Sequence, residues 1–184
     1  MASVLIPLAD GFEEIEAVTV IDLLRRGGVE VVVAGLADGP VRGSHDIPVM
    51  PDLALDEALG RDYDMMVLPG GMPGADHLEA DGRVRELLTR LANSGRFTAA
   101  ICAAPKVLAA AGLLEDRRAT SFPGFLDPAR TPGLTLSEDP VVQDGRVITS
   151  RGPGTAMDFA LALIENLAGP DVRHEVEARL QRPG

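Results

Sequence analysis

The feature that most constrains the fold of this chain is the alternation of short apolar runs with segments of helical periodicity. Residues 29–34 are β-branched and small apolar residues except for Glu30, a composition typical of a strand buried on both faces of a parallel sheet. Residues 13–26 instead carry apolar side chains at helical spacing and end at Gly27-Gly28. Repeated along a chain, this strand–helix order predicts an α/β fold of the doubly wound type: a mostly parallel sheet with helices on both faces.

The remaining elements follow from the same patterns. We expect buried strands at residues 4–8, 29–34, 65–68 and 97–101, an edge hairpin within 41–50, and a second hairpin from 141–143 and 147–149. Helices are predicted over residues 13–26, 84–91, 103–111, 156–167 and 172–180, and an irregular stretch over 120–135. The sequence contains no internal repeat, linker or low-complexity segment, so we expect residues 1–184 to form a single domain.

Composition narrows the classes of partner. The 184 residues include 28 acidic and 17 basic ones, a formal charge of −11. Nucleic acids and anionic membranes both require a basic face, so neither is an expected partner. The first residues do not resemble a signal peptide, and no run approaches the roughly 20 apolar residues that span a bilayer. We therefore expect a cytoplasmic protein, whose thiols are kept reduced.

Cys102 is the only cysteine, and it stands between the predicted strand 97–101 and an alanine-rich segment that carries Pro105 early. Proline suits the first turn of a helix, so Cys102 is predicted at a sharp strand-to-helix turn. Free backbone N–H groups and the helix dipole at such a turn favour the thiolate, which is the nucleophilic form. The alternative is a small buried apolar side chain without reactivity.

Other chemically useful residues follow the predicted strands at the same edge of the sheet, where ligands of such folds bind. Glu13 and Glu14 suit the first turn of a helix, whereas Glu16 lies deeper. From the residues alone, a capping or surface role for Glu16 is favoured over a protonated carboxyl that donates to Cys102. Gly70-Gly71 is either a tight turn or a source of N–H donors for an oxyanion.

Metal, cofactor and hydrolase chemistry find little support in the sequence. His45, His77 and His174 are scattered and none adjoins Cys102, so no metal site is expected. The glycines after residue 69 do not match a dinucleotide fingerprint, and no cofactor is predicted. Ser121 and Ser150 lack the surroundings of a serine nucleophile.

Four blocks, taken together, resemble the DJ-1/ThiJ/PfpI superfamily and specifically its DJ-1-like branch. They are Leu8-Ala9-Asp10-Gly11-Phe12-Glu13-Glu14-Ile15-Glu16, Val67-Leu68-Pro69-Gly70-Gly71, Ala100-Ile101-Cys102-Ala103-Ala104-Pro105 and Thr149-Ser150-Arg151-Gly152-Pro153-Gly154-Thr155. They occur in the family's order over nearly the whole chain. The resemblance implies a flavodoxin-like sandwich that forms a homodimer.

The resemblance also implies residue roles. Cys102 matches the family's strained cysteine, and Glu16 matches the protonated glutamate that lowers the pKa of that cysteine and stabilises its sulfinate. Gly71 and Ala103 match the backbone donors beside the sulfur. Further candidates for a substrate site or a dimer contact are Glu13, Gly70, Arg26, His45, Phe122, Arg151 and Pro153. Of these, Arg26 matches a dimer-contact arginine, and His45 replaces an arginine that lines the partner's site in some members.

The chain departs from the family where many members place a histidine near the cysteine. Ala103 and Phe122 occupy the two positions concerned, which makes peptidase activity unlikely. We expect a stress protein that acts on methylglyoxal, glyoxal or their protein adducts, with glyoxalase or deglycase activity. The alternative is a redox sensor or chaperone without catalysis, in which Cys102 is oxidised to a sulfinate.

Overall fold

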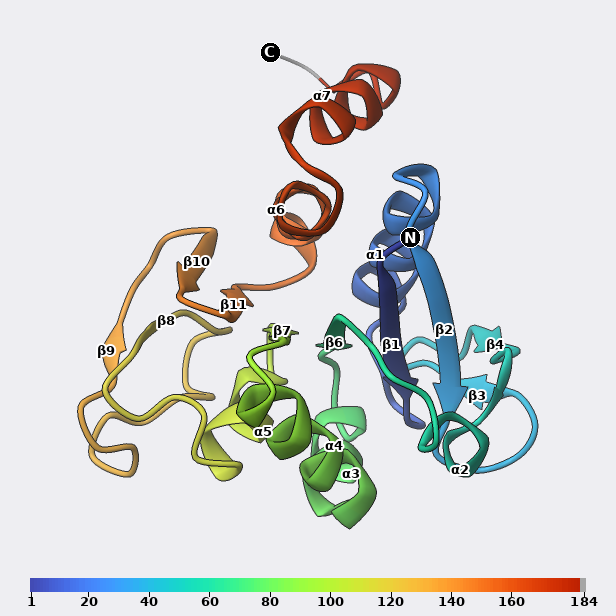
Figure 1. Cartoon of the computed structure of the whole chain (residues 1–184). Coiled ribbons are helices and arrows are strands. Elements are labelled where there is room, and N and C mark those ends of the chain that lie inside the picture. Colours follow the sequence, from blue (N-terminus) through green and yellow to red (C-terminus); the bar gives the residue numbers. More distant parts are fainter. Residues whose placement is uncertain (183–184) are drawn as a thin grey trace.

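The computed structural model describes residues 1–182, and its centre is a seven-stranded sheet with the order β10-β11-β7-β6-β1-β2-β5 (Figure 1). The strands are β1 (Ser3–Leu8), β2 (Glu30–Gly35), β5 (Leu53–Ala54), β6 (Met65–Leu68), β7 (Phe97–Ile101), β10 (Val141–Asp144) and β11 (Val147–Ser150). Neighbours pair in parallel except β10, which is antiparallel to β11. This confirms the predicted fold class.

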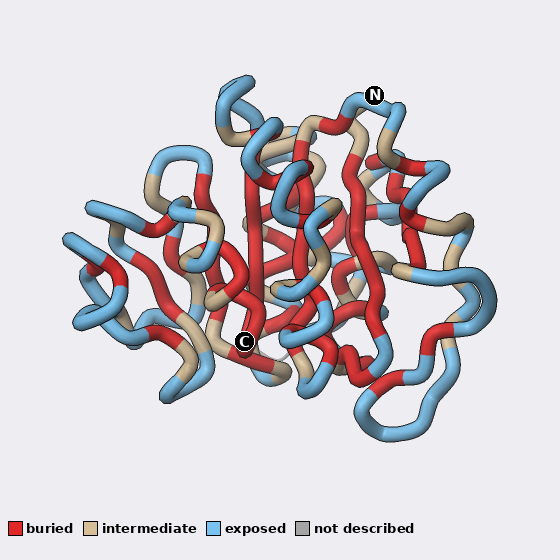
Figure 2. The backbone as a smooth tube through the Cα atoms, turned by 90° about the horizontal axis from the view of Figure 1, so that it is seen from below, coloured by how far each residue is buried: buried red, intermediate tan, exposed pale blue. Residues whose placement is uncertain are grey.

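Helices cover both faces of the sheet, as Figure 1 shows. One layer contains α1 (Glu14–Arg26) and α6 (Ala156–Ala168), with α7 (Pro170–Arg179) packed on α6; the other contains α2 (Leu55–Ala58), α3 (Gly74–Ala80), α4 (Gly82–Asn93) and α5 (Pro105–Ala110). Side chains of successive strand residues pack alternately on the two faces of the sheet: Ile6 packs in the core beside α1 and α6, and Leu5 packs in the core on the opposite face. The strands β6, β7 and β11 are accordingly buried at every residue, and β1 and β2 at all but their first (Figure 2).

Two sequence predictions need correction. Helix α3 begins at Gly74, where only a glycine-rich turn was expected, because its seven residues are too few to show a periodic pattern. The segment 41–50 does not extend the main sheet: β3 (Val41–Arg42) and β4 (Pro48–Val49) form a two-stranded sheet of their own. The remaining short elements are β8 (Arg118–Ala119), β9 (Thr135–Leu136) and the 3₁₀ turn η1 (Pro153–Thr155).

The β3–β4 segment is instead attached to the loop before α1. The amide of Gly11 donates to the Arg42 carbonyl at 2.8 Å, and the Arg42 amide donates to Oδ1 of Asp10 at 2.8 Å. The Ser44 amide donates to the Phe12 carbonyl at 2.8 Å. These bonds hold the β3–β4 turn beside the first turn of α1.

The parallel strands β1, β6, β7 and β11 end at one edge of the sheet, at Leu8, Leu68, Ile101 and Ser150. The segments directly after these four strands carry most of the residues singled out from the sequence; Arg26, His45 and Phe122 lie elsewhere. Within residues 1–182, no helix is both long enough and apolar enough to cross a membrane.

Candidate active site

Cys102 occupies the turn between β7 and α5 in a left-handed backbone conformation, with φ of 65°. Such a conformation costs about 1–3 kcal/mol for a residue with a side chain, so the surroundings must hold it. The Cys102 amide donates to the Ser150 carbonyl, and the Phe122 amide donates to the Cys102 carbonyl, both at 2.9 Å. The side chain is largely buried. The turn therefore fixes the direction in which the sulfur points.

Glu16 lies in the first turn of α1 and faces this cysteine. Its side chain is fully buried, which excludes the capping or surface role that the residues alone favoured. The Gly70 amide donates to Oε2 of Glu16 at 2.8 Å. The other oxygen, Oε1, has no hydrogen-bond partner among the described residues, and the carboxyl as a whole lies close enough to the Cys102 thiol to affect its pKa.

The absence of a side chain at Gly70 allows the side chains of Cys102 and Glu16 to lie close together. A Cβ atom at this position would lie 2.6 Å from Cβ of Cys102 and 2.7 Å from Oε2 of Glu16. Any larger residue would therefore push apart the thiol and the carboxyl. Glycine at position 70 is therefore required by this close contact as well as by the turn.

Two backbone N–H groups lie beside the sulfur. Those of Gly71 and Ala103 act on Cys102 as donors that favour its thiolate. Gly71 has φ of 90°, and a side chain there would collide with the backbone of Glu13 and Gly11. The two donors would equally stabilise an oxyanion formed beside the sulfur.

Burial dominates the electrostatics of the Cys102–Glu16 pair. It raises the pKa of Glu16 to about 7; the nearby Glu13 carboxylate acts in the same direction, while bonds from Cys102 and Gly70 oppose it. Burial likewise raises the pKa of Cys102 to about 12, reinforced by the charge of an ionised Glu16. The expected lowering of the thiol pKa is therefore not found, because desolvation outweighs the two backbone donors.

The raised pKa values mean that the pair holds both protons below about pH 7 and a single shared proton above it. When Glu16 is ionised, the proton stays on sulfur and the carboxylate is placed to accept it. When Glu16 is protonated, its charge no longer opposes the thiolate, and its O–H becomes a donor to sulfur. Glu16 can therefore act as base and then as acid toward a group bound at Cys102.

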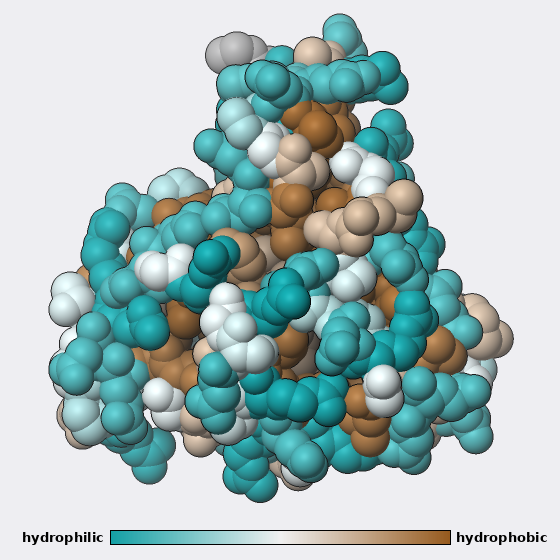
Figure 3. Space-filling view, in the orientation of Figure 1, coloured by the Kyte–Doolittle hydropathy of each residue, from teal (hydrophilic) through white to brown (hydrophobic). Residues whose placement is uncertain are grey.

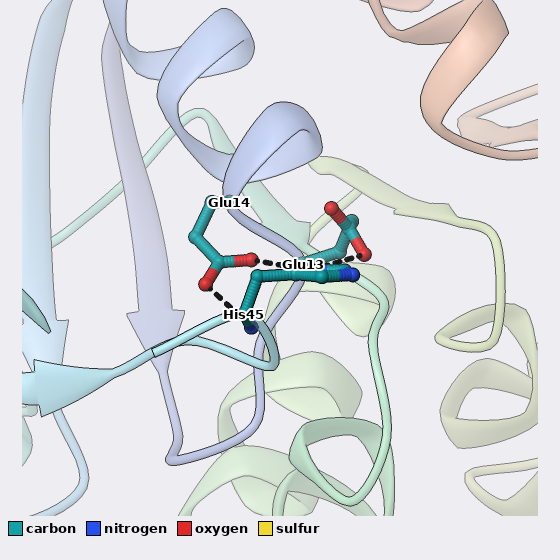
Figure 4. Close-up of side chains that lie close together, drawn as sticks. All are labelled: Glu13, Glu14 and His45. Atoms are coloured by element: carbon teal, nitrogen blue, oxygen red, sulfur yellow. Dashed lines mark hydrogen bonds and ion pairs between the residues drawn. The ribbon is translucent and has the colours of Figure 1, made fainter. Parts of the chain in front are cut away.

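A second group of polar side chains gathers at the other side of the α1 N-terminus (Figure 4). The buried Glu14 carboxylate accepts the amides of His45 at 2.7 Å and Ile47 at 3.3 Å, and its Oε2 lies 3.1 Å from Nδ1 of His45. Burial opposes ionisation of Glu14, but these bonds lower its pKa to about 2. The hydrogen bond with Glu14 raises the pKa of His45.

Similarity to known proteins identifies the family to which this chain belongs. Residues 2–166 match the model of the DJ-1/PfpI family. The chain belongs to the DJ-1/PfpI family. It is 44% identical to protein DJ-1alpha of Drosophila melanogaster over 174 residues, which cover 94% of this chain and 80% of that protein.

Other members of the DJ-1/PfpI family share both sequence and fold with this chain. A Caenorhabditis elegans protein named glutathione-independent glyoxalase DJR-1.2 is 39% identical over 92% of this chain and 90% of its own length. The crystal structure of Drosophila melanogaster DJ-1beta superposes with a TM-score of 0.93 and 38% identity, covering 100% of this chain and 99% of that one.

Phe122, Arg151 and Pro153, the candidates from the C-terminal half, line one surface cavity of about 520 Å³ together with Pro123. Phe122 stands where a family histidine was expected, and its ring packs edge-on against Phe125 with centroids 6.2 Å apart. Arg151 donates to the Glu138 carbonyl at 3.1 Å. The cavity is connected to the cysteine turn through Phe122, whose amide donates to the Cys102 carbonyl.

Arg26 is not brought to the cysteine within its own chain. It ends α1, about 18 Å along the helix from Glu14, and pairs with Asp22 at 2.6 Å. Glu13 lies between the two polar groups: its amide donates to the Gly70 carbonyl at 2.9 Å, and its carboxylate lies 3.7 Å from Nδ1 of His45.

The Glu14–His45 contact was missed by sequence reasoning. Its members are 31 residues apart and belong to different elements, so no local spacing reveals them. The one local signal is Gly43, where a side chain would occupy the space of the Glu14 carboxylate.

Proposed function

We propose that this member of the DJ-1/PfpI family is a cysteine-dependent enzyme of the glyoxalase or deglycase type. Its substrates would be methylglyoxal, glyoxal or the adducts that these carbonyls form with proteins. The observation that carries the proposal is the convergence of Cys102 and the buried Glu16 at Gly70, beside two backbone donors. The C. elegans relative named a glyoxalase supports it.

The first step joins sulfur to the aldehyde carbon of methylglyoxal. As the S–C bond forms, the thiol proton passes to the Glu16 carboxylate, and the aldehyde oxygen becomes an oxyanion held by the N–H groups of Gly71 and Ala103. Glu16 then returns the proton to that oxygen. The product is a hemithioacetal, and Glu16 is again a carboxylate.

The second stage moves hydrogen from C1 to C2. Glu16 removes the C1 proton, and the electron pair forms a C1=C2 bond while the ketone oxygen takes the charge. Glu16 then protonates C2, and the C1 hydroxyl proton moves to the C2 oxygen, which leaves a lactoyl thioester. Water breaks the S–C1 bond to give lactate and the thiol. C1 is oxidised as C2 is reduced, so no external oxidant or reductant is required.

Substitution at the nucleophile tests the proposal. We expect Cys102→Ser to abolish lactate formation from methylglyoxal while its circular dichroism spectrum and melting curve stay close to those of the unmodified protein. Lactate formed at the same rate by Cys102→Ser would contradict the proposal.

A redox role for the same residue is the second candidate, and it is favoured because Ala103 and Phe122 occupy the two positions at which a histidine base was considered. Two equivalents of peroxide would convert the Cys102 thiol to a sulfinic acid with release of two waters, and Glu16 would donate to a sulfinate oxygen. A cytoplasmic location, with its reduced thiols, would suit this role. Intact mass after mild peroxide must show two added oxygens, which Cys102→Ser lacks.

We also propose a homodimer, supported by large apolar side chains that are exposed on α1 and beside β4. Ile15 and Val18 on α1 are 57% and 47% exposed, and Ile47 and Met50 beside β4 are 54% and 70% exposed. Figure 3 shows apolar surface between α7 and the body of the molecule, where α1 and α6 lie. Light scattering should give twice the chain mass, and Ile15→Asp should lower it; a monomer in the unmodified protein would contradict the proposal.

A further inference from the structure

The side chains of Glu13, Glu14 and His45 form a group with the composition of a metal site, separate from Cys102. One carboxylate oxygen from each glutamate and Nδ1 of His45 all lie within 4.8 Å of one another. Figure 4 shows the two glutamates approaching His45 from the start of α1, while His45 comes from the turn between β3 and β4. Imidazole nitrogen combined with carboxylate oxygen is a ligand set that suits zinc and related divalent transition metals.

The distances match the size of such an ion. Nδ1 of His45 lies 3.1 Å from Oε2 of Glu14 and 3.7 Å from Oε2 of Glu13. A tetrahedral ion with metal–ligand distances of about 2.1 Å holds its ligand atoms about 3.4 Å apart. The two distances from His45 therefore lie within about 0.3 Å of this spacing, and the two glutamate oxygens lie within 4.8 Å of each other.

The charges of these side chains also favour a bound cation. The side chains of Glu13 and Glu14 are only 12% and 7% exposed, yet among residues 1–182 neither is paired with an arginine or a lysine. His45, which is 70% exposed, is their one basic neighbour and can supply at most a single positive charge. Two largely buried carboxylates beside one imidazole leave a negative excess that a dication would neutralise.

The surrounding backbone holds the ligands in place. The amides of His45 and Ile47 donate to Oε1 of Glu14, which leaves Oε2 directed at the imidazole. Gly43 makes room for this carboxylate, since a side chain there would overlap it. Outer contacts of this kind orient metal ligands.

The Ser44 hydroxyl completes the surroundings of the three ligand atoms. Its Oγ lies 3.3 Å from Oε2 of each glutamate and 3.1 Å from Nδ1 of His45. The exposure of His45 leaves a side of the group open to water, as a fourth ligand requires.

We propose that Glu13, Glu14 and His45 bind one divalent transition-metal ion of the zinc type, with water in the fourth position. The site does not involve Cys102, and the proposal is independent of the glyoxalase activity. It departs from the expectation drawn from the sequence, which was that the chain has no metal site.

Calorimetric titration of the tag-free, chelator-treated protein with zinc chloride tests the proposal. The Cys102→Ser variant serves as the parent, so that the thiol cannot bind the metal. We expect one zinc ion per chain. Adding His45→Ala should lower the zinc affinity at least about tenfold, because substitutions of residues that only hydrogen-bond to metal ligands already lower metal affinity by about that factor. The exposed His174→Ala is the matched control and should bind like the parent.

Glu13→Gln keeps the test decisive if His45→Ala fails to fold, because it changes a single ligand oxygen and no backbone contact. It too should weaken zinc binding at least about tenfold. Failure of the parent to bind zinc, or equal affinity in the parent and in folded His45→Ala or Glu13→Gln, would overturn the proposal.

Discussion

Glu14 and Glu16 stand two residues apart in the first turn of α1, both buried, and they have opposite acid–base behaviour. Glu14 accepts two backbone amides from the β3–β4 turn and contacts an imidazole, and its pKa falls to about 2. Glu16 accepts a single amide and faces a thiol, and its pKa rises to about 7. Burial opposes ionisation in both, so the number of donors that meet each carboxylate decides its charge.

Because their pKa values differ, the two glutamates on this helix turn can support two kinds of chemistry. A carboxylate that stays ionised can hold a segment or a cation, whereas one that titrates near neutral pH can move protons. The same helix therefore anchors the β3–β4 turn with Glu14 and serves Cys102 with Glu16.

The largest expected effect is on catalysis. Glu16→Gln should lower kcat for lactate formation from methylglyoxal about 10²- to 10⁴-fold, because the amide cannot accept or return a proton. Initial rates measured by lactate assay give the value, with the exposed Glu86→Gln as the control. A rate within a factor of two of the control would remove Glu16 from the mechanism.

The next effect is on the pH dependence of stability. Because the pKa of Glu16 rises from 4.5 to about 7 on folding, its protonated form is favoured in the folded state. Its contribution is fully present below pH 4.5 and is lost as pH rises through 7, by about 3 kcal/mol. Urea unfolding at intervals from pH 4 to 8 should show this fall relative to Glu16→Gln; parallel curves would contradict the raised pKa.

Glu14 should behave in the opposite sense. Its lowered pKa contributes stability that is present above pH 4.5 and lost as pH falls toward 2. Glu14→Gln should therefore destabilise the protein at pH 7 by about 1.5–3 kcal/mol, the value of hydrogen bonds to a charged group. Urea unfolding at pH 7 measures it, and a loss no larger than that of Glu86→Gln would show that the anchor is unimportant.

The smallest effect concerns the glycine between thiol and carboxyl. Gly70→Ala should cost about 1–3 kcal/mol of stability, since its methyl group would overlap Cys102 and Glu16. It should also slow alkylation of Cys102 by iodoacetamide or change its pH dependence, as the pair is forced apart. Gly60→Ala, with open space around it, is the control. Equal behaviour of the two variants would show that the contact at Gly70 is not tight.

The sequence predicted the strands of this molecule better than the pKa values of its buried groups. The strands at 65–68 and 97–101 were predicted at their observed bounds because unbroken apolar runs are local signals. The resemblance placed Glu16 beside Cys102, but both the resemblance and the position at a helix start indicated a lowered thiol pKa. The balance depends on burial, which only the packed structure reveals. The contact of Glu14 with His45 depends on the path of the β3–β4 turn and was not predictable.

Carbon-13 NMR of protein labelled at the glutamate side-chain carboxyl tests the contrast most directly. The account predicts a carboxyl resonance with a midpoint near pH 7 that disappears in Glu16→Gln and persists in Glu14→Gln. A second resonance should remain ionised down to about pH 2 and disappear in Glu14→Gln. A Glu16 midpoint near 4.5, the ordinary value for glutamate, would contradict the account.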